Sequence, residues 1–289
     1  MFIRLILQTL CVSYLLLNPA FAYECGKEKH STRPESESEV SKLKYPWLVF
    51  IKVKDFNVTR GCSGAIIGKK HVLTSLNCVR VDNDTLVNPF YVHAYLGTHS
   101  GKYYSSAKIR ALNFIYKELQ DSNGQNGGDL VTIELEREIN LHRKSMPICL
   151  FNHDSDLSKI EELTILGWNG SLKGYPQRPH RGRMNLVSEC QSQPNEHQGK
   201  LGSSELEFCA TDNSQESQCP GDIGSPLMWK NEKENRWFLF GVAPSRNSCM
   251  FNDHPAPFIN VMNYMKKMKE NGISIEEGDI KSDDIPKMV

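Results

Sequence analysis

The sequence predicts an all-β fold, either a sandwich or a barrel, from three observations. Short runs rich in Val, Ile, Phe, Tyr and Trp recur along the chain, as expected of strands. Gly, Asn, Asp and Pro separate these runs and indicate turns. Only one segment, close to the C-terminus, has helical periodicity. The length of 289 residues suits one large all-β domain or two small ones.

Eight strands are expected in order along the chain. They cover residues 47–53, 65–67, 71–75, 91–96, 130–135, 163–168, 237–242 and 258–261. A helix is expected next, because Met262, Met265 and Met268 recur every third residue with lysines between them, and Asn271-Gly272 ends the pattern. We interpret the methionine stripe as a surface that packs on a barrel, not as a cofactor site.

The two ends of the chain differ from its middle in composition. Residues 1–22 combine a basic start, a short apolar run and an Ala-x-Ala site, which predicts a secretory signal peptide. The apolar run is too short and too often interrupted by polar residues for a membrane anchor. Residues 23–44 are polar and predict an exposed lead-in segment, tethered at most through Cys25. Residues 273–289 form an acidic tail, which leaves residues 45–272 for the folded domain.

The cysteine count also suits a secreted, extracellular protein. Nine cysteines less Cys11 of the signal peptide leave an even number, which favours disulfides over free thiols, with on the order of 100 connectivities open. Three Asn-x-Ser/Thr triplets predict glycan acceptors at Asn57, Asn83 and Asn169. The formal net charge of zero gives no indication of nucleic acid or of an acidic membrane surface as a partner. No cofactor and no metal site are predicted.

One stretch carries most of the functional information. Residues 219–227 read Cys-Pro-Gly-Asp-Ile-Gly-Ser-Pro-Leu. They resemble the active-site loop Cys-x-Gly-Asp-Ser-Gly-Gly-Pro-Leu of the chymotrypsin/trypsin family of serine proteases. The position of the nucleophilic serine holds Ile223, whose side chain has neither a lone pair nor a transferable proton.

Further segments resemble the same family in order and spacing. They are residues 45–49, 61–67, 71–78, 128–135, 166–169 and 255–268. The resemblance implies two six-stranded antiparallel β-barrels with a C-terminal helix and an active-site cleft between the barrels. It also implies four disulfides, namely Cys25–Cys149, Cys62–Cys78, Cys190–Cys209 and Cys219–Cys249. A further bridge common in the family is replaced by Leu163 and Trp229.

The resemblance assigns the remaining triad positions to Asn77 and Asp129. In the family a hydroxyl attacks, an imidazole takes its proton and a carboxylate orients the imidazole. Asn77 occupies the imidazole position, and an amide does not accept a proton near neutral pH. Asp129 could orient a base, but we favour a local hydrogen-bonding role between the barrels. We do not expect His71 or Ser225 to substitute for the missing groups.

The specificity pocket and the activation segment depart from the family pattern as well. Ser217 falls at the pocket base, where an acidic residue would select Arg or Lys. Pro244 and Arg246 lie in the pocket wall, where one removes a backbone donor and the other adds bulk, so substrate docking should be impaired. The expected activation site reads Arg33-Pro34, which should resist cleavage and leave Asp222 without its usual new N-terminal amine.

These observations predict a secreted, non-catalytic serine protease homologue that binds an extracellular protein as cofactor, decoy or regulator. Two alternatives remain. One is an active serine-type endopeptidase with a rearranged site. The other is a secreted structural or storage protein without a defined partner.

Overall fold

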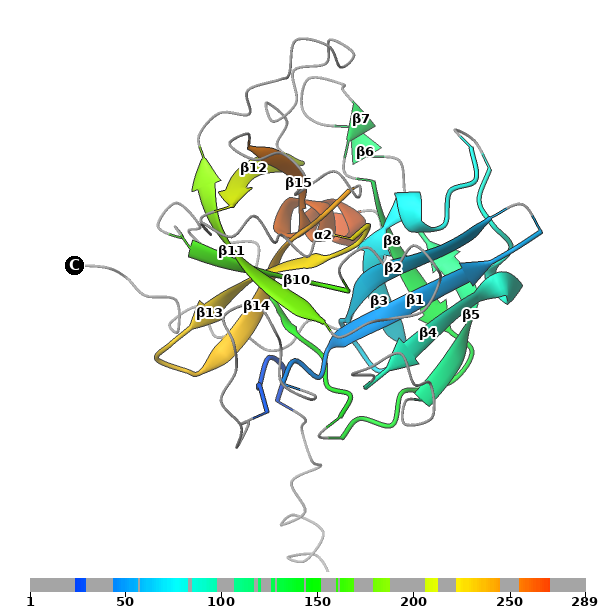
Figure 1. Ribbon diagram of the computed structural model, residues 1–289, viewed down its shortest axis with the longest axis horizontal. Coiled ribbons are helices and arrows are strands. Elements are labelled where there is room, and N and C mark those ends of the chain that lie inside the picture. The colour runs from blue at the N-terminus through cyan, green and yellow to red at the C-terminus, as the bar shows by residue number, and fades with distance from the viewer. Residues whose placement is uncertain are drawn as a thin grey trace, which may run out of the picture.

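Two closed β-barrels lie side by side in the computed structural model of the chain (Figure 1). The structure describes residues 24–29, 44–56, 58–82, 85–97, 107–116, 119–120, 126–127, 129–142, 144–151, 160, 162–168, 179–187, 206–212, 222–244 and 255–270. Each barrel has six strands, so the expected all-β fold with two six-stranded barrels and a C-terminal helix is confirmed.

The first barrel comes from the N-terminal half of the chain. Its strands pair around the ring in the order β1 (Leu48–Lys54), β2 (Thr59–Ile66), β3 (His71–Ser75), β8 (Leu130–Leu135), β5 (Ala107–Ile115) and β4 (Val92–Leu96), and β4 pairs back with β1. Every pairing is antiparallel. On β1, Ile51 and Val53 are fully buried while Lys54 is exposed, which is the alternation expected of a barrel wall.

The second barrel closes in the same way. Its strands are β13 (Pro226–Asn231), β10 (Glu162–Gly167), β11 (His180–Val187), β12 (Glu207–Asp212), β15 (Ala256–Asn260) and β14 (Arg236–Val242), and β14 pairs back with β13. A two-residue strand, β9 (Cys149–Leu150), adds to the outer side of β14. The β9–β14 pairing is parallel, an exception to the antiparallel pattern.

Four of the twelve barrel strands, β5, β11, β12 and β13, are absent from the sequence prediction. Three of them carry polar side chains along much of their length, for example His180, Arg181 and Arg183 on β11. Their outer faces meet solvent, so no continuous apolar run marks them. β2 is also longer than the expected run 65–67, because it continues back through Gly61 and Gly64 to Thr59. A short separate ladder joins β6 (Leu119–Gln120) to β7 (Asn126–Gly127). Like β9, these two-residue strands are absent from the sequence prediction.

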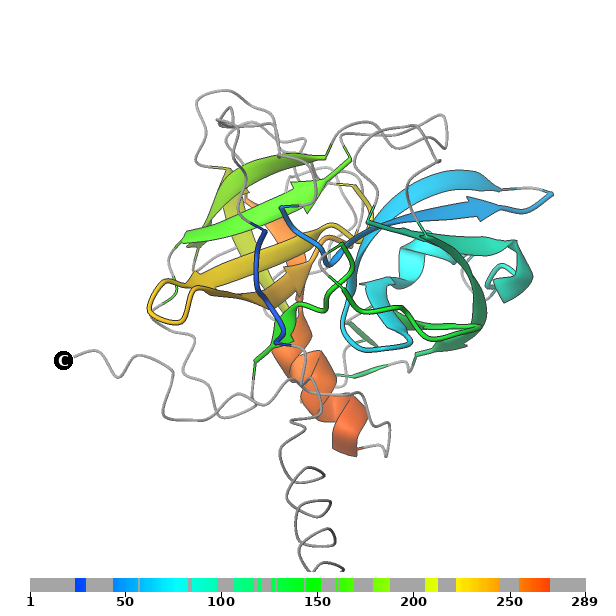
Figure 2. The ribbon, with the colours of Figure 1, turned by 90° about the horizontal axis from the view of Figure 1, so that it is seen from below.

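The C-terminal helix α2 (Val261–Glu270) packs where the two barrels meet (Figure 2). Met265 is buried in the larger core cluster, which contains residues of both barrels, and Met262 packs against a smaller cluster inside the second barrel. Tyr264, between them, is fully buried and its hydroxyl donates to the Leu130 carbonyl at 2.7 Å. The expected docking of the helix on the barrels therefore depends on a tyrosine as much as on the methionine stripe.

The described part of the lead-in segment is held by more than the expected single tether. The Cys25–Cys149 disulfide joins it to β9. The Glu28 carboxylate accepts a hydrogen bond from the Trp237 indole at 3.2 Å and pairs with Lys230 at 3.5 Å. Two of these three contacts are to the β13–β14 hairpin, so residues 24–29 are docked on the second barrel.

Candidate functional site

The loop that carries Ile223 has a tightly constrained backbone. Gly224 adopts φ = 80°, a conformation that costs other residues free energy. A Cβ atom at this position would lie 2.0 Å from Thr74 Oγ1 and 2.2 Å from the Ser63 carbonyl oxygen. The Gly224 N–H donates to the Ala243 carbonyl at 2.9 Å. Glycine is therefore required where this loop of the second barrel presses against the first.

The two side chains beside Gly224 lie in different environments. Ile223 is half-buried and packs against the larger core cluster, which contains residues of both barrels, while its carbonyl accepts from the Ser63 N–H at 2.8 Å. Ser225 is fully buried, and its Oγ accepts from the Asp222 N–H at 2.8 Å. As expected, Ser225 belongs to the interior of the loop and does not take the place of a cleft nucleophile.

Asp222 directs its carboxylate into the protein. It is 5% exposed. One carboxylate oxygen accepts from the Trp168 N–H and from the Ser63 hydroxyl, the latter at 3.4 Å. A buried carboxylate needs such donors, because its desolvation is otherwise costly. The expected activation site at Arg33-Pro34 lies outside the described residues.

Asn77 lies at the centre of a one-turn 3₁₀-helix, η1 (Leu76–Cys78), directly after β3. Its Nδ2 donates to the Pro244 carbonyl at 3.1 Å, and Ser75 Oγ donates to the same oxygen at 3.0 Å. Pro244 follows β14, so both hydrogen bonds join the first barrel to the second. His71 begins β3, four residues and roughly 13 Å of strand before Ser75, which places it at the far end of the strand from Asn77.

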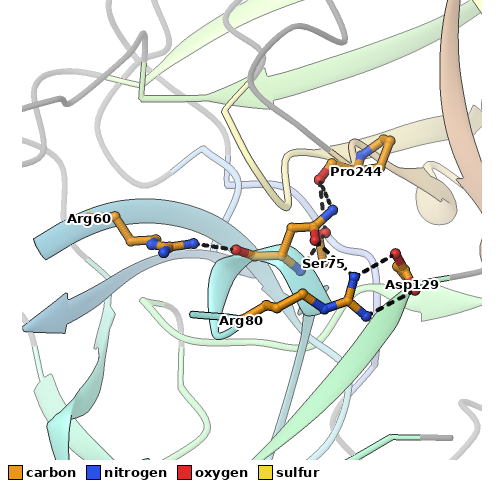
Figure 3. A network of polar contacts seen from close by, with 6 residues as sticks. Arg60, Ser75, Arg80, Asp129 and Pro244 are labelled. Atoms are coloured by element: carbon orange, nitrogen blue, oxygen red, sulfur yellow. Dashed lines mark hydrogen bonds and ion pairs between the residues drawn. The ribbon is translucent and has the colours of Figure 1, made fainter. Parts of the chain in front are cut away.

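Arg80 forms an ion pair with Asp129, the carboxylate that would orient a catalytic base. Its guanidinium contacts both oxygens of Asp129, at 3.2 and 3.5 Å, and also approaches Asn77 Oδ1 at 3.4 Å (Figure 3). Arg60 donates to the Asn77 carbonyl at 2.6 Å from the opposite side. Sequence reasoning missed Arg80. Its spacing of three residues from Asn77 was the available signal, because the chain makes a single turn there and the Arg80 N–H bonds to the Leu76 carbonyl.

A second carboxyl lies near this ion pair. Glu207 begins β12, and burial raises the pKa of its carboxyl, with a further contribution from the negative charge of Asp129. Two acidic groups from the two barrels therefore act on each other across their junction. No local pattern of residues indicated this proximity, because β12 was not among the expected strands.

Several predicted residues cannot be placed. Ser217, Arg246, the three glycan acceptors (Asn57, Asn83 and Asn169) and Cys190, Cys219 and Cys249 all lie outside the described residues. Two of the disulfides implied by the resemblance, Cys25–Cys149 and Cys62–Cys78, are present. Cys209 is also disulfide-bonded. Leu163 is buried and Trp229 packs against the same core cluster, one step beyond the Thr164–Met228 pair of the β10–β13 ladder.

The described residues contain no group of His, Cys, Asp and Glu side chains that could hold a metal ion. Within the same residues, no helix combines the length and the apolar character needed to cross a bilayer. Around the junction of the barrels the structure thus places an apolar side chain, an amide and an ion-paired carboxylate. These are the positions to which the resemblance assigns the nucleophile, the base and the orienting acid.

Comparison with known proteins agrees with this architecture. The sequence model of the family described as Trypsin matches residues 36–268. The chain is similar to coagulation factor XI of Bos taurus, 24% identical over 226 residues, and to CLIP domain-containing serine protease C9 of Anopheles gambiae, 24% identical over 237 residues. Each match covers 76% of this chain, but 35% of the first relative and 62% of the second. The chain spans less than two thirds of either relative. On the match to the family model and the two closed barrels, the chain belongs to the trypsin-like serine protease family.

Proposed function

We propose that this protein is a secreted, non-catalytic member of the family, which acts by binding another extracellular protein as a cofactor, decoy or regulator. The observation that carries the proposal is the pairing of Arg80 with Asp129 beside Asn77. Together with Ile223, it leaves each of the three triad roles without the group that performs it.

The chemistry of acyl transfer explains why these three changes act together. A nucleophile needs a hydroxyl or thiol and an adjacent base, and Ile223 and Asn77 supply neither. The third role, orientation of an imidazole, requires a carboxylate that is free to accept its N–H. In this chain the Asp129 carboxylate accepts from the Arg80 guanidinium instead. The Asn77 amide then serves as a hydrogen-bond link to Pro244 across the two barrels.

Secretion is part of the same proposal. It is supported by the predicted signal peptide at residues 1–22 and by the disulfides Cys25–Cys149 and Cys62–Cys78. Such bonds persist in oxidising compartments and are rare in the cytosol. The predicted division into a lead-in segment, a domain at 45–272 and an acidic tail belongs to the proposal as well.

The first alternative is a peptidase that uses rearranged groups. Among the described serines near the site, Ser63, Ser75 and Ser225 are all fully buried. Ser75 Oγ donates to Pro244, and Ser225 Oγ accepts from Asp222. These hydroxyls are therefore engaged inside the protein, which disfavours this alternative. The second alternative, a structural or storage protein, predicts no saturable partner.

The test is labelling with a fluorophosphonate, which reacts only with an activated serine. The secreted full-length protein should remain unlabelled before and after treatment with trypsin, while an active trypsin in the same mixture is labelled. Stoichiometric labelling would overturn the proposal. Saturable capture of a defined protein from the native extracellular fluid separates the binding role from a structural or storage role.

A further inference from the structure

The exposed apolar side chains are unevenly distributed between the two barrels. Among the described residues, the large hydrophobic side chains that are exposed all belong to the first barrel and its loops: Phe56, Val81, Phe90, Leu112 and Tyr116. Phe56 is 90% exposed and Phe90 is 57% exposed. Single exposed hydrophobic residues are ordinary, but a contiguous group marks an interaction surface.

Three aromatic side chains form such a group, which we call the aromatic rim: Phe56, Phe90 and Tyr91. Phe56 lies in the β1–β2 hairpin turn, which extends away from the second barrel (Figures 1 and 2). Its ring meets that of Tyr91 edge-on at 5.8 Å, and Tyr91 meets Phe90 at 5.4 Å. Tyr91 and Phe90 belong to the 3₁₀-helix η2 (Pro89–Tyr91). Segments from two separate parts of the chain therefore build one exposed aromatic surface.

A row of basic side chains lies beside the aromatic rim. On the adjoining strands β1, β4 and β5, Lys52 pairs in register with His93, and His93 pairs with Arg110. Lys54 and Lys108 each lie two residues from a member of this row, and alternate residues of a strand share a face. We call these five residues the cationic face. The Arg110 guanidinium lies 4.9 Å from the centre of the Phe90 ring, which joins the cationic face to the aromatic rim.

The cationic face is an excess of positive charge in a chain whose formal net charge is zero. Burial lowers the pKa of Lys52, and the charges of Lys54 and Lys108 lower it further. Burial also lowers the pKa of His93; Lys108, Arg110 and Lys52 lower it further, while Glu136 raises it. Within the described part of the chain, Glu136 contacts the face by pairing with Arg110 at 2.9 Å. The nearby Asp55 carboxylate accepts from the Phe56 N–H. Like charges held together in this way favour an anionic ligand.

We propose that the cationic face and the aromatic rim together dock an acidic, extended polypeptide segment of a partner protein that also carries apolar side chains. The cations would meet its carboxylates, and the exposed rings of Phe56 and Phe90 would cover its apolar side chains. The exposed rings favour a polypeptide over a sulfated polysaccharide, which has no apolar side chain to bury. This inference rests on the proposed binding function and names the surface and the partner chemistry.

The test uses a fluorescein-labelled peptide of about ten residues, roughly 30 Å when extended, in which Glu and Asp alternate with Leu and Phe. A poly-glutamate peptide of equal charge and a heparin oligosaccharide are the comparison ligands. Binding to the full-length secreted protein is measured by fluorescence anisotropy. Heparin and poly-glutamate binding are measured as competition with the labelled peptide.

The expected result is saturable binding of the acidic apolar peptide that weakens between ~50 and ~300 mM NaCl. The double variant Lys54→Glu/Lys108→Glu and the double variant Phe56→Ser/Phe90→Ser should each weaken it by about tenfold or more. Lys69→Glu/Lys233→Glu makes the same charge change at exposed positions outside the face and should change binding by less than about twofold. All variants alter exposed side chains, and an unchanged circular dichroism spectrum checks that they fold.

Two results would overturn the inference. One is the absence of saturable peptide binding, or binding that Lys54→Glu/Lys108→Glu and Phe56→Ser/Phe90→Ser both leave unchanged. The other is equal binding of poly-glutamate or heparin with no effect of Phe56→Ser/Phe90→Ser, which would identify the ligand as any polyanion. Fluorophosphonate labelling of the same preparations separates the two proposals. If the protein stays unlabelled and binds no peptide, only the proposed docking surface is refuted. If the protein is labelled, the proposed non-catalytic function is refuted whether or not the peptide binds.

Discussion

The loop at residues 222–225 and the turn around Asn77 face each other across the junction of the barrels, and they differ in what they retain. In the loop, the backbone geometry suits a tight approach to the first barrel: Gly224 has a positive φ and no room for a Cβ atom. In the turn, polar side chains remain, but they bond to one another and to Pro244. The loop keeps the backbone geometry that packing between the barrels requires. The turn lies at the position that the resemblance assigns to the catalytic base, but it lacks the imidazole.

This difference shows that packing and catalysis constrain different residues at the junction of the two barrels. A glycine against a buried backbone has no substitute, because any side chain would collide with Thr74 and Ser63. An imidazole or a hydroxyl at the junction of the barrels can be exchanged for an amide or an alkyl group, provided that the polar atoms nearby find partners. Arg80 provides such a partner for Asp129.

The largest expected effect concerns an attempt to restore activity. Asn77→His with Ile223→Ser returns two triad residue types, and a complete triad is worth on the order of 10⁶ in turnover. Loss of the orienting carboxylate alone costs about 10⁴-fold, and Arg80 holds that carboxylate here. The double variant should therefore remain at least about 10³-fold below an ordinary trypsin on a peptide ester substrate.

Adding Arg80→Ala to this double variant should raise turnover, because it releases Asp129. The remaining deficit then reports the pocket and the activation segment. A double variant that cleaves at rates near those of an ordinary trypsin would show that only two side chains had been lost and that the Arg80–Asp129 pair is irrelevant.

The next effect is on folding stability. Gly224→Ala introduces a Cβ atom at a positive φ and against two atoms of the first barrel, so we expect a destabilisation of roughly 2–5 kcal/mol. Ile223→Ala, one residue earlier and half-buried, should cost about 1 kcal/mol. Chemical denaturation of both variants measures the contrast. Equal stabilities would refute the separation between a constrained backbone and a replaceable side chain.

A pH dependence of stability should arise from Glu207. Burial and Asp129 raise its pKa above 4.5 in the folded state. Between pH 4.5 and the folded-state pKa, the folded protein therefore binds more protons than the unfolded chain. The contribution of Glu207 to stability is therefore full below pH 4.5 and is lost as the pH rises through the folded-state pKa. Glu207→Gln should consequently gain in Tm relative to the wild type as the pH rises to about 7. Glu162→Gln, at an exposed position of the same barrel, should show no such trend.

The smallest effect is expected from the ion pair itself. The Arg80 side chain is 26% exposed and that of Asp129 is 45% exposed, so solvent screens their attraction. Arg80→Ala should destabilise the protein by less than about 1 kcal/mol. A double-mutant cycle with Asp129→Asn, read by urea denaturation, isolates the pair from other contacts of Arg80. A coupling energy several times larger would mean that this turn supports the fold as strongly as the loop does.

The sequence was sufficient for the fold class and for much of the site. The strand at His71–Ser75 was predicted with its observed bounds, because Val72, Leu73 and the β-branched Thr74 favour a short strand in a barrel wall. Ile223 and Asn77 were identified from short motifs, since a motif fixes the residue type at a position without any knowledge of its surroundings. The strands β11 and β12 were missed because their polar outer faces break the apolar pattern.

What residue types are missing from the triad positions could be read from the sequence alone, because it depends on single positions. What the remaining polar groups bind was decided by the tertiary structure. Arg80 meets Asp129 49 residues along the chain, and Asn77 meets Pro244 across 167 residues and two barrels. The aromatic rim likewise joins a hairpin turn to η2. Contacts at such separations follow from barrel closure and from how the two barrels pack, and no local pattern of residues records them.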